Sequence, residues 1–204
     1  MEFLLTYTPI PGIVLWIVLY ISDYYMTLAA AKGYKEVGVI QFEKSLELNP
    51  VFQKDINSQT KVSTRHLIFL FIYSIAIPVF WFITVQVFEV YWAYSFFIGA
   101  LILMEVTIHM RHLRNLYLLH VFRKSGGITG SITYAQWFSY KISAFDFYVF
   151  SVLYLLFFLL TYSFFFLGGL VICLRIGVSH TMLARKAIAK PKTAIVQNAD
   201  SSSG

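Results

Sequence analysis

One stretch of the sequence, EVTIHMRHLRNLYLLH between Glu105 and His120, combines a carboxylate with three imidazoles at helical spacing. At about 100° per residue, Glu105, His109, His112 and His120 lie within roughly 80° of one another on a helix. Imidazoles titrate near neutral pH, and together with carboxylates inside a membrane they can relay protons or line a path for cations. We therefore expect Glu105, His109, His112 and the intramembrane carboxylate Asp23 to form such a path, with His120 as a secondary member.

The same side chains also suit a metal site. Neutral imidazole and ionised carboxylate are ligands for a divalent metal such as Zn²⁺, and most sites take three or four ligands from more than one element. Glu105, His109 and His112 would supply the first three. The remaining ligands would come from acidic residues that we expect on the same side of the membrane, namely Asp23, Glu47 or Asp146. A metal ion held there would activate water to hydrolyse a lipid or a lipid-linked substrate.

A third interpretation needs no turnover. Polar residues at the end of a membrane helix often pair between helices or reach the lipid headgroups. Arg111 and Arg114 suit lipid phosphates in particular. Three functions therefore stay open: a proton or cation channel or transporter built as a small homo-oligomer, a metal-dependent membrane enzyme, and an accessory or lipid-binding protein.

The composition indicates that lipid surrounds most of the chain. Of 204 residues, 58% are hydrophobic and only 13% are charged, whereas soluble domains are roughly 45–50% apolar and about 25% charged. The net charge of +6 fits loops that face anionic lipid headgroups. Nucleic acid is a poor partner, because the basic residues form no long soluble patch. Cys173 is the single cysteine, so an internal disulfide is excluded.

Long apolar runs predict an all-α, polytopic membrane protein with a single transmembrane domain over residues 1–190. About 20 apolar residues cross the ~30 Å hydrocarbon layer. Four spans are expected, at about 11–31, 66–87, 92–119 and 147–174. The last run is long enough for one tilted helix, and two helices with a turn at Gly168 and Gly169 are the alternative, which would give five spans.

Two more polar segments between the spans are expected to be amphipathic helices in the membrane interface, at about 35–48 and 133–145. In the first, Val39, Phe42 and Leu46 recur at helical spacing, and Asn49 and Pro50 are expected to end the helix. Residues 191–204 are predicted to be a disordered tail or an added linker, and we exclude them from the predicted fold.

The basic residues predict the orientation of the chain. Lysine and arginine are concentrated between spans one and two and again after span three, and none lies between spans two and three. The positive-inside rule therefore places these loops in the cytoplasm and the N-terminus outside, with the plasma membrane as the expected location. Four spans would also place the C-terminus outside, although Arg175, Arg185 and Lys186 favour the inside. Five spans would remove this conflict.

Overall fold

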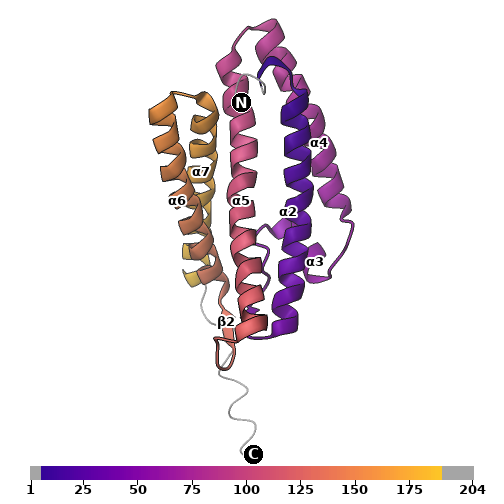
Figure 1. The fold of residues 1–204 in the computed structure, drawn as a ribbon, viewed down its shortest axis with the longest axis vertical. Helices are drawn as coiled ribbons and strands as arrows, with labels where there is room; N and C mark the ends of the chain where they lie inside the picture. Colours follow the sequence, from indigo (N-terminus) through magenta and orange to yellow (C-terminus); the bar gives the residue numbers. More distant parts are fainter. Residues whose placement is uncertain (1–5, 190–204) are drawn as a thin grey trace, which may run out of the picture.

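Five long helices make up most of the molecule (Figure 1), in a computed structural model that describes residues 6–189. The expected tail over 191–204 lies outside the described residues. The long helices are α2 (Ile10–Val37), α4 (Thr64–Trp81) continued by the π-helix η1 (Phe82–Val87), α5 (Tyr91–Ser125), α6 (Gln136–Thr161) and α7 (Phe164–Ala189). All five are long and apolar enough to cross a membrane. The architecture is that of a multi-pass, all-α membrane protein.

The first three spans correspond to α2, to α4 with η1, and to α5. The last apolar run differs from the single helix expected over 147–174, because it forms the two antiparallel helices α6 and α7. The chain reverses at Tyr162, which adopts a left-handed conformation with φ of 53° and donates its backbone N–H to the Phe158 carbonyl. The turn therefore lies before the glycine pair Gly168 and Gly169, and these glycines pack inside α7.

In place of the interfacial helix expected over 35–48, the structure extends α2 to Val37 and continues as strand β1 (Ile40–Phe42) and a bent segment. Helix α3 (Pro50–Asn57) begins where the expected helix was to end. The Asn49 side chain caps it by accepting the Val51 N–H at 3.1 Å, and Pro50 occupies the first turn, where a proline costs no hydrogen bond. Asn-Pro marks a helix start here.

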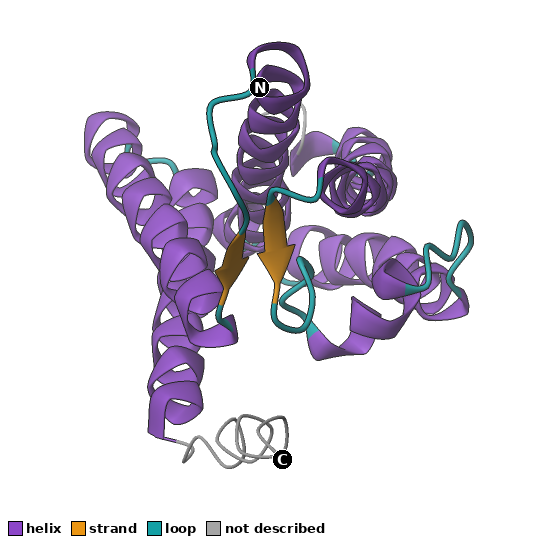
Figure 2. Cartoon of the chain, turned by 90° about the horizontal axis from the view of Figure 1, so that it is seen from below, coloured by secondary structure: helices purple, strands orange, loops and turns teal. Residues whose placement is uncertain are grey.

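The second expected interfacial helix, over 133–145, is also replaced. Its first residues belong to strand β2 (Ile132–Tyr134), and the rest is the beginning of α6. Strands β1 and β2 form a small parallel sheet at one end of the molecule, with Ile40 opposite Ile132 (Figure 2). The strands are parallel because each follows one of two helices, α2 and α5, that run in the same direction.

Helix α5 lies in the middle, with α2 and α4 on one side and α6 and α7 on the other (Figure 1). Glycine allows α5 and α7 to touch through their backbones. A Cβ atom on Gly168 would lie 2.0 Å from the Phe96 carbonyl oxygen, and one on Gly99 would lie 2.1 Å from that of Phe165. Small residues are the usual means by which membrane helices pack this closely.

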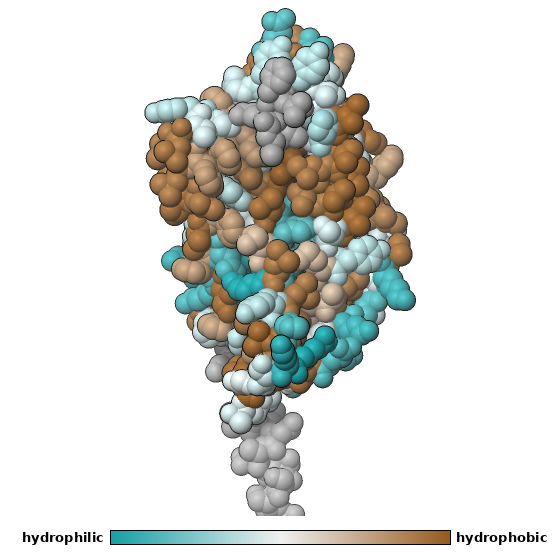
Figure 3. All heavy atoms as spheres, viewed as in Figure 1, coloured by the Kyte–Doolittle hydropathy of each residue, from teal (hydrophilic) through white to brown (hydrophobic). Residues whose placement is uncertain are grey.

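Hydrophobic side chains cover much of the upper part of the molecule, and hydrophilic ones gather toward the lower end, near β2 (Figure 3). We call this lower end the charged end. The charged end contains the α2–α4 and α5–α6 connections and the end of α7, which includes Arg185 and Lys186. At the opposite end of the molecule, the turn between η1 and α5 has a single charged residue, Glu89. The five-helix arrangement thus places the basic loops and the end of α7 together and removes the conflict of the four-span expectation.

Candidate functional site: a polar line between α2 and α5

Two parallel helices, α2 and α5, face each other through polar side chains in the half of the molecule that leads to the charged end. We call this row of side chains the polar line, and its central members are Ser22, Asp23, Thr27, Glu105, His109 and His112. His112 of α5 is buried and its Nε2 lies 2.9 Å from Asp23 Oδ1 and 3.0 Å from Thr27 Oγ1. The Thr27 hydroxyl donates to the Asp23 carbonyl, so it accepts a hydrogen bond from His112 Nε2. Nε2 therefore carries a proton, and the buried Nδ1, with no hydrogen-bond partner among residues 6–189, is the atom that can take a second one.

Glu105 lies two turns before His112 on the same face of α5. It is 2% exposed, and its Oε2 has no hydrogen-bond partner within the described chain. Its carboxyl group interacts electrostatically with Asp23 and with the Tyr20 hydroxyl. A buried carboxyl group beside a second acidic residue is costly to keep inside a membrane.

His109 lies between these two residues and is held at both ring nitrogens. Its Nδ1 donates to the Glu105 backbone carbonyl at 2.7 Å, and its Nε2 lies 2.6 Å from Ser22 Oγ. Ser22 can also donate to the Leu19 carbonyl at 2.9 Å. A neutral His109 would accept the serine proton at Nε2. A protonated His109 would donate to Ser22, which would then donate to Leu19, so both protonation states have complete hydrogen bonding here.

Glu47 reaches the same region from the bent segment before α3. Its Oε1 accepts the Asn49 backbone N–H at 2.6 Å, and its carboxyl group interacts electrostatically with Asp23, His112 and Arg111. Burial raises the pKa of Glu47 above its ordinary value, and the Asn49 hydrogen bond opposes this shift. Glu47 thus lies where the line meets the charged end.

Asp146 of α6, the third acidic residue expected nearby, is neutralised by arginines. Arg114 binds both of its carboxylate oxygens, at 2.7 and 3.0 Å, and Arg111 Nε lies 3.5 Å from Oδ2. Lipid phosphates, the ligands that we expected for Arg111 and Arg114, would have to compete with this carboxylate. Asp146 therefore joins α5 to α6 and does not extend the polar line.

Toward the other membrane face the line continues through aromatic side chains. The Tyr20 hydroxyl interacts electrostatically with Glu105 and with Tyr73, and the Tyr20 ring stacks on Trp16 at a centroid distance of 4.8 Å. Trp16 Nε1 and the Tyr94 hydroxyl are buried with no hydrogen-bond partner in the described part of the chain. At ~1.5 Å per residue, the part of α5 from Tyr94 to His112 is about 27 Å long, nearly the thickness of the hydrocarbon layer.

A metal site is not assembled from these residues. Within residues 6–189, no group of three or more His, Cys, Asp and Glu side chains converges as metal ligands. Glu105, His109 and His112 share a face of α5, but His109 is turned to Ser22 and His112 to Asp23. His120 is exposed, beyond the buried part of the stripe.

Ser22 and His109 have the distance of a nucleophile and its base, and Ser22 lines an apolar groove of about 580 Å³ on α2. Acyl transfer also needs donors for the oxyanion. Helix α2 is continuous through Ser22, so the neighbouring backbone N–H groups are already bonded within the helix. The pair is therefore better suited to passing a proton than to covalent catalysis.

Several members of the line carry no charge at neutral pH and were not predicted as site residues from the sequence: Trp16, Tyr20, Ser22, Thr27 and Tyr94. A signal for most of the α2 residues is present, because Trp16, Tyr20, Asp23 and Thr27 recur at intervals of three or four and so share one face of a helix.

No model of a known protein family matches this chain, and neither a curated protein nor a solved structure matches it. The function must therefore be inferred from the geometry of the site.

Proposed function

We propose that the protein transfers protons across the membrane along the polar line between α2 and α5. The observation that carries this proposal is Glu105, a buried carboxyl group with an unpartnered oxygen, close to Asp23 and Tyr20 inside a membrane-spanning helix. An ionisable residue at such a position is costly to keep and is typical of proton relays.

The spacing of the groups supports proton transfer in particular. His112 can hold a second proton at Nδ1, His109 has hydrogen-bond partners in both protonation states, and Glu105 can hold a proton on its unpartnered oxygen. A proton moves between neighbouring donors and acceptors and needs no open pore. A metal cation needs several converging oxygen or nitrogen ligands, and the described residues hold no such group of side chains.

One chain supplies the whole line, since both of its helices are in the same chain. The homo-oligomer that we expected for a channel is thus not required for this proposal and stays a prediction. The same applies to the plasma membrane as the location and to the cytoplasmic position of the charged end, which the positive-inside rule favours.

Proton flux into liposomes tests the proposal. Purified protein would be reconstituted into vesicles that contain a pH-sensitive dye, and a potassium diffusion potential would drive protons inward. We expect acidification well above that of protein-free vesicles, and no comparable uptake of sodium or potassium in a parallel cation assay. Proton flux equal to that of empty vesicles over pH 5–8 would rule the proposal out, and cation uptake would favour a channel for larger ions.

A further inference from the structure

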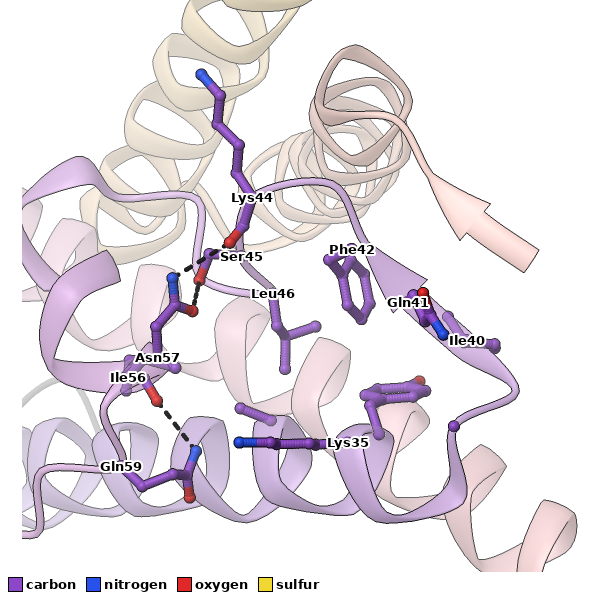
Figure 4. A pocket seen from close by; sticks show the side chains of 13 residues that line it. Lys35, Ile40, Gln41, Phe42, Lys44, Ser45, Leu46, Ile56, Asn57 and Gln59 are labelled. Atoms are coloured by element: carbon purple, nitrogen blue, oxygen red, sulfur yellow. Dashed lines mark hydrogen bonds between the residues drawn. The ribbon is translucent and has the colours of Figure 1, made fainter. Parts of the chain in front are cut away.

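A second site lies at the charged end, next to Glu47, where the polar line ends. A pocket of about 330 Å³ opens there between the last turns of α2, strand β1, the bent segment after it and the end of α3 (Figure 4). Its volume is at the lower end of the range for small-molecule sites. Its lining includes the cations Lys35 and Lys44 but no aspartate or glutamate.

Lys35 gives the pocket its positive charge. Its side chain runs along the pocket with the ammonium group directed toward Gln59, whereas Lys44 lies at the rim and points outward (Figure 4). Neither lysine forms an ion pair with the described acidic residues. One turn away on α2, in contrast, Lys32 pairs with Glu36 at 3.7 Å. A cation without a neutralising partner beside a pocket favours an anionic ligand.

Two amides in the lining, Asn57 and Gln59, are held in place by hydrogen bonds. Asn57 Oδ1 accepts the Ser45 hydroxyl at 2.8 Å, and Asn57 Nδ2 donates to the Lys44 carbonyl at 3.2 Å. Gln59 Nε2 donates to the Ile56 carbonyl at 3.0 Å, and Gln59 has a φ of 54°, which is uncommon for a residue other than glycine. Strained backbone of this kind is concentrated at binding sites. Here it fixes the Gln59 amide at the edge of the pocket, where Nε2 has a second N–H besides the one bonded to Ile56.

Apart from Gln41, the remaining lining is mostly apolar. Tyr34 and Phe42 pack edge to face with ring centroids 5.4 Å apart, and Ile40 and Ile56 are buried. The site therefore pairs an apolar wall with a cation and fixed amides. We propose that this pocket binds a phosphate group attached to an apolar body. Lysine and amide donors are common phosphate partners, and the charged end of a membrane protein lies beside lipid phosphates.

Binding of defined phosphates by the full-length protein tests the inference. Titration calorimetry in an uncharged detergent would use dihexanoyl phosphatidylglycerol and, separately, glycerol 3-phosphate. We expect saturable binding of the phosphatidylglycerol, which carries apolar chains, weakened at least tenfold in Lys35→Gln. Binding of glycerol 3-phosphate without the lipid would contradict the apolar half of the proposal. Lys32→Gln removes the same charge from the same helix outside the pocket, and its affinity should stay within about twofold of the wild type.

The two probes separate the sources of the phosphate. Saturable binding of the lipid alone assigns the site to a membrane headgroup, and binding of glycerol 3-phosphate as well assigns it to a soluble phosphate ester. A second variant, Ala31→Leu, fills the pocket without changing its charge and should also abolish binding. Non-saturable binding, or an equal loss in Lys35→Gln and Lys32→Gln, would overturn the inference. The inference is independent of proton transfer, because neither Lys35 nor Ala31 belongs to the polar line.

Discussion

His112 and Asp23 join α5 to α2 inside the bundle, with 2.9 Å between the imidazole Nε2 and the carboxylate Oδ1. The Thr27 hydroxyl, 3.0 Å from the same nitrogen, holds the ring in place. These contacts bring two helices that are far apart in the sequence into register, so that Glu105 of α5 lies close to Asp23 and Tyr20 of α2.

We predict that His112→Ala destabilises the protein, because it leaves Asp23 without the imidazole beside it. The loss of a buried polar partner costs about 1–3 kcal/mol. Thermal unfolding in detergent measures the effect. Thr27→Ser keeps the hydroxyl and should change the midpoint little. Equal midpoints for His112→Ala and the wild type would show that the contact does not hold the helices together.

Gly168→Leu should separate α5 from α7. A Cβ atom at this position would lie 2.0 Å from the Phe96 carbonyl oxygen, a backbone atom that cannot move aside without shifting the helix. We expect destabilisation of about 3 kcal/mol or more, seen as a lower unfolding midpoint. The matched change Val171→Leu, on the exposed face of α7, should be tolerated. An unaffected Gly168→Leu variant would contradict the close helix contact.

Five spans predict which residues share a side of the membrane. In a Cys173→Ala background, Lys61→Cys and Lys186→Cys should react with a membrane-impermeant maleimide from one side, and Glu89→Cys from the other. A four-span chain would instead expose Lys186→Cys and Glu89→Cys on the same side. Labelling in sealed vesicles of known orientation distinguishes the two topologies and also shows which side is cytoplasmic.

Glu47 should make the stability depend on pH. Burial raises its pKa in the folded protein above the ordinary value of 4.5, so between these two values the folded chain binds more protons than the unfolded chain. Stability therefore falls as pH rises through this interval. Glu47→Gln has no such proton and should show a shallower fall when unfolding midpoints are measured from about pH 4 to pH 7. Parallel curves for both proteins would contradict the burial of this carboxyl group.

The long helices could be predicted because an apolar run of 20 or more residues has few alternatives in a membrane. The reversal at Tyr162 could not, since its left-handed backbone is set by the packing of α6 on α7, and tyrosine carries no preference for it. The segment over 35–48 does not form the helix predicted from its sequence. Val39, Phe42 and Leu46 also fit a short strand followed by bends, and Asn49 and Pro50 begin a helix as readily as they end one.

The ionisable residues of the site could be predicted from the sequence because such residues are rare and costly within membrane spans. Glu105, His112 and Asp23 stand out by type alone, and the structure brings them to one interface. Trp16 and Tyr94 resemble ordinary core aromatics in the sequence, and only their buried, unpartnered polar atoms connect them to the line. The pairing of Asp146 with Arg111 and Arg114 depends on how α6 packs on α5. The spacing of residues in the sequence does not specify this packing.

Proton flux through Glu105→Gln compared with Glu89→Gln is the most direct measurement of the central claim. Both variants replace one glutamate by its neutral amide, but Glu105 is buried in the line and Glu89 is exposed at the opposite end of the molecule. Glutamine cannot bind and release a proton, so we predict that Glu105→Gln lowers dye-reported flux in liposomes to that of empty vesicles while Glu89→Gln retains wild-type flux. Wild-type flux in a folded, fully reconstituted Glu105→Gln variant would contradict proton transfer along this line.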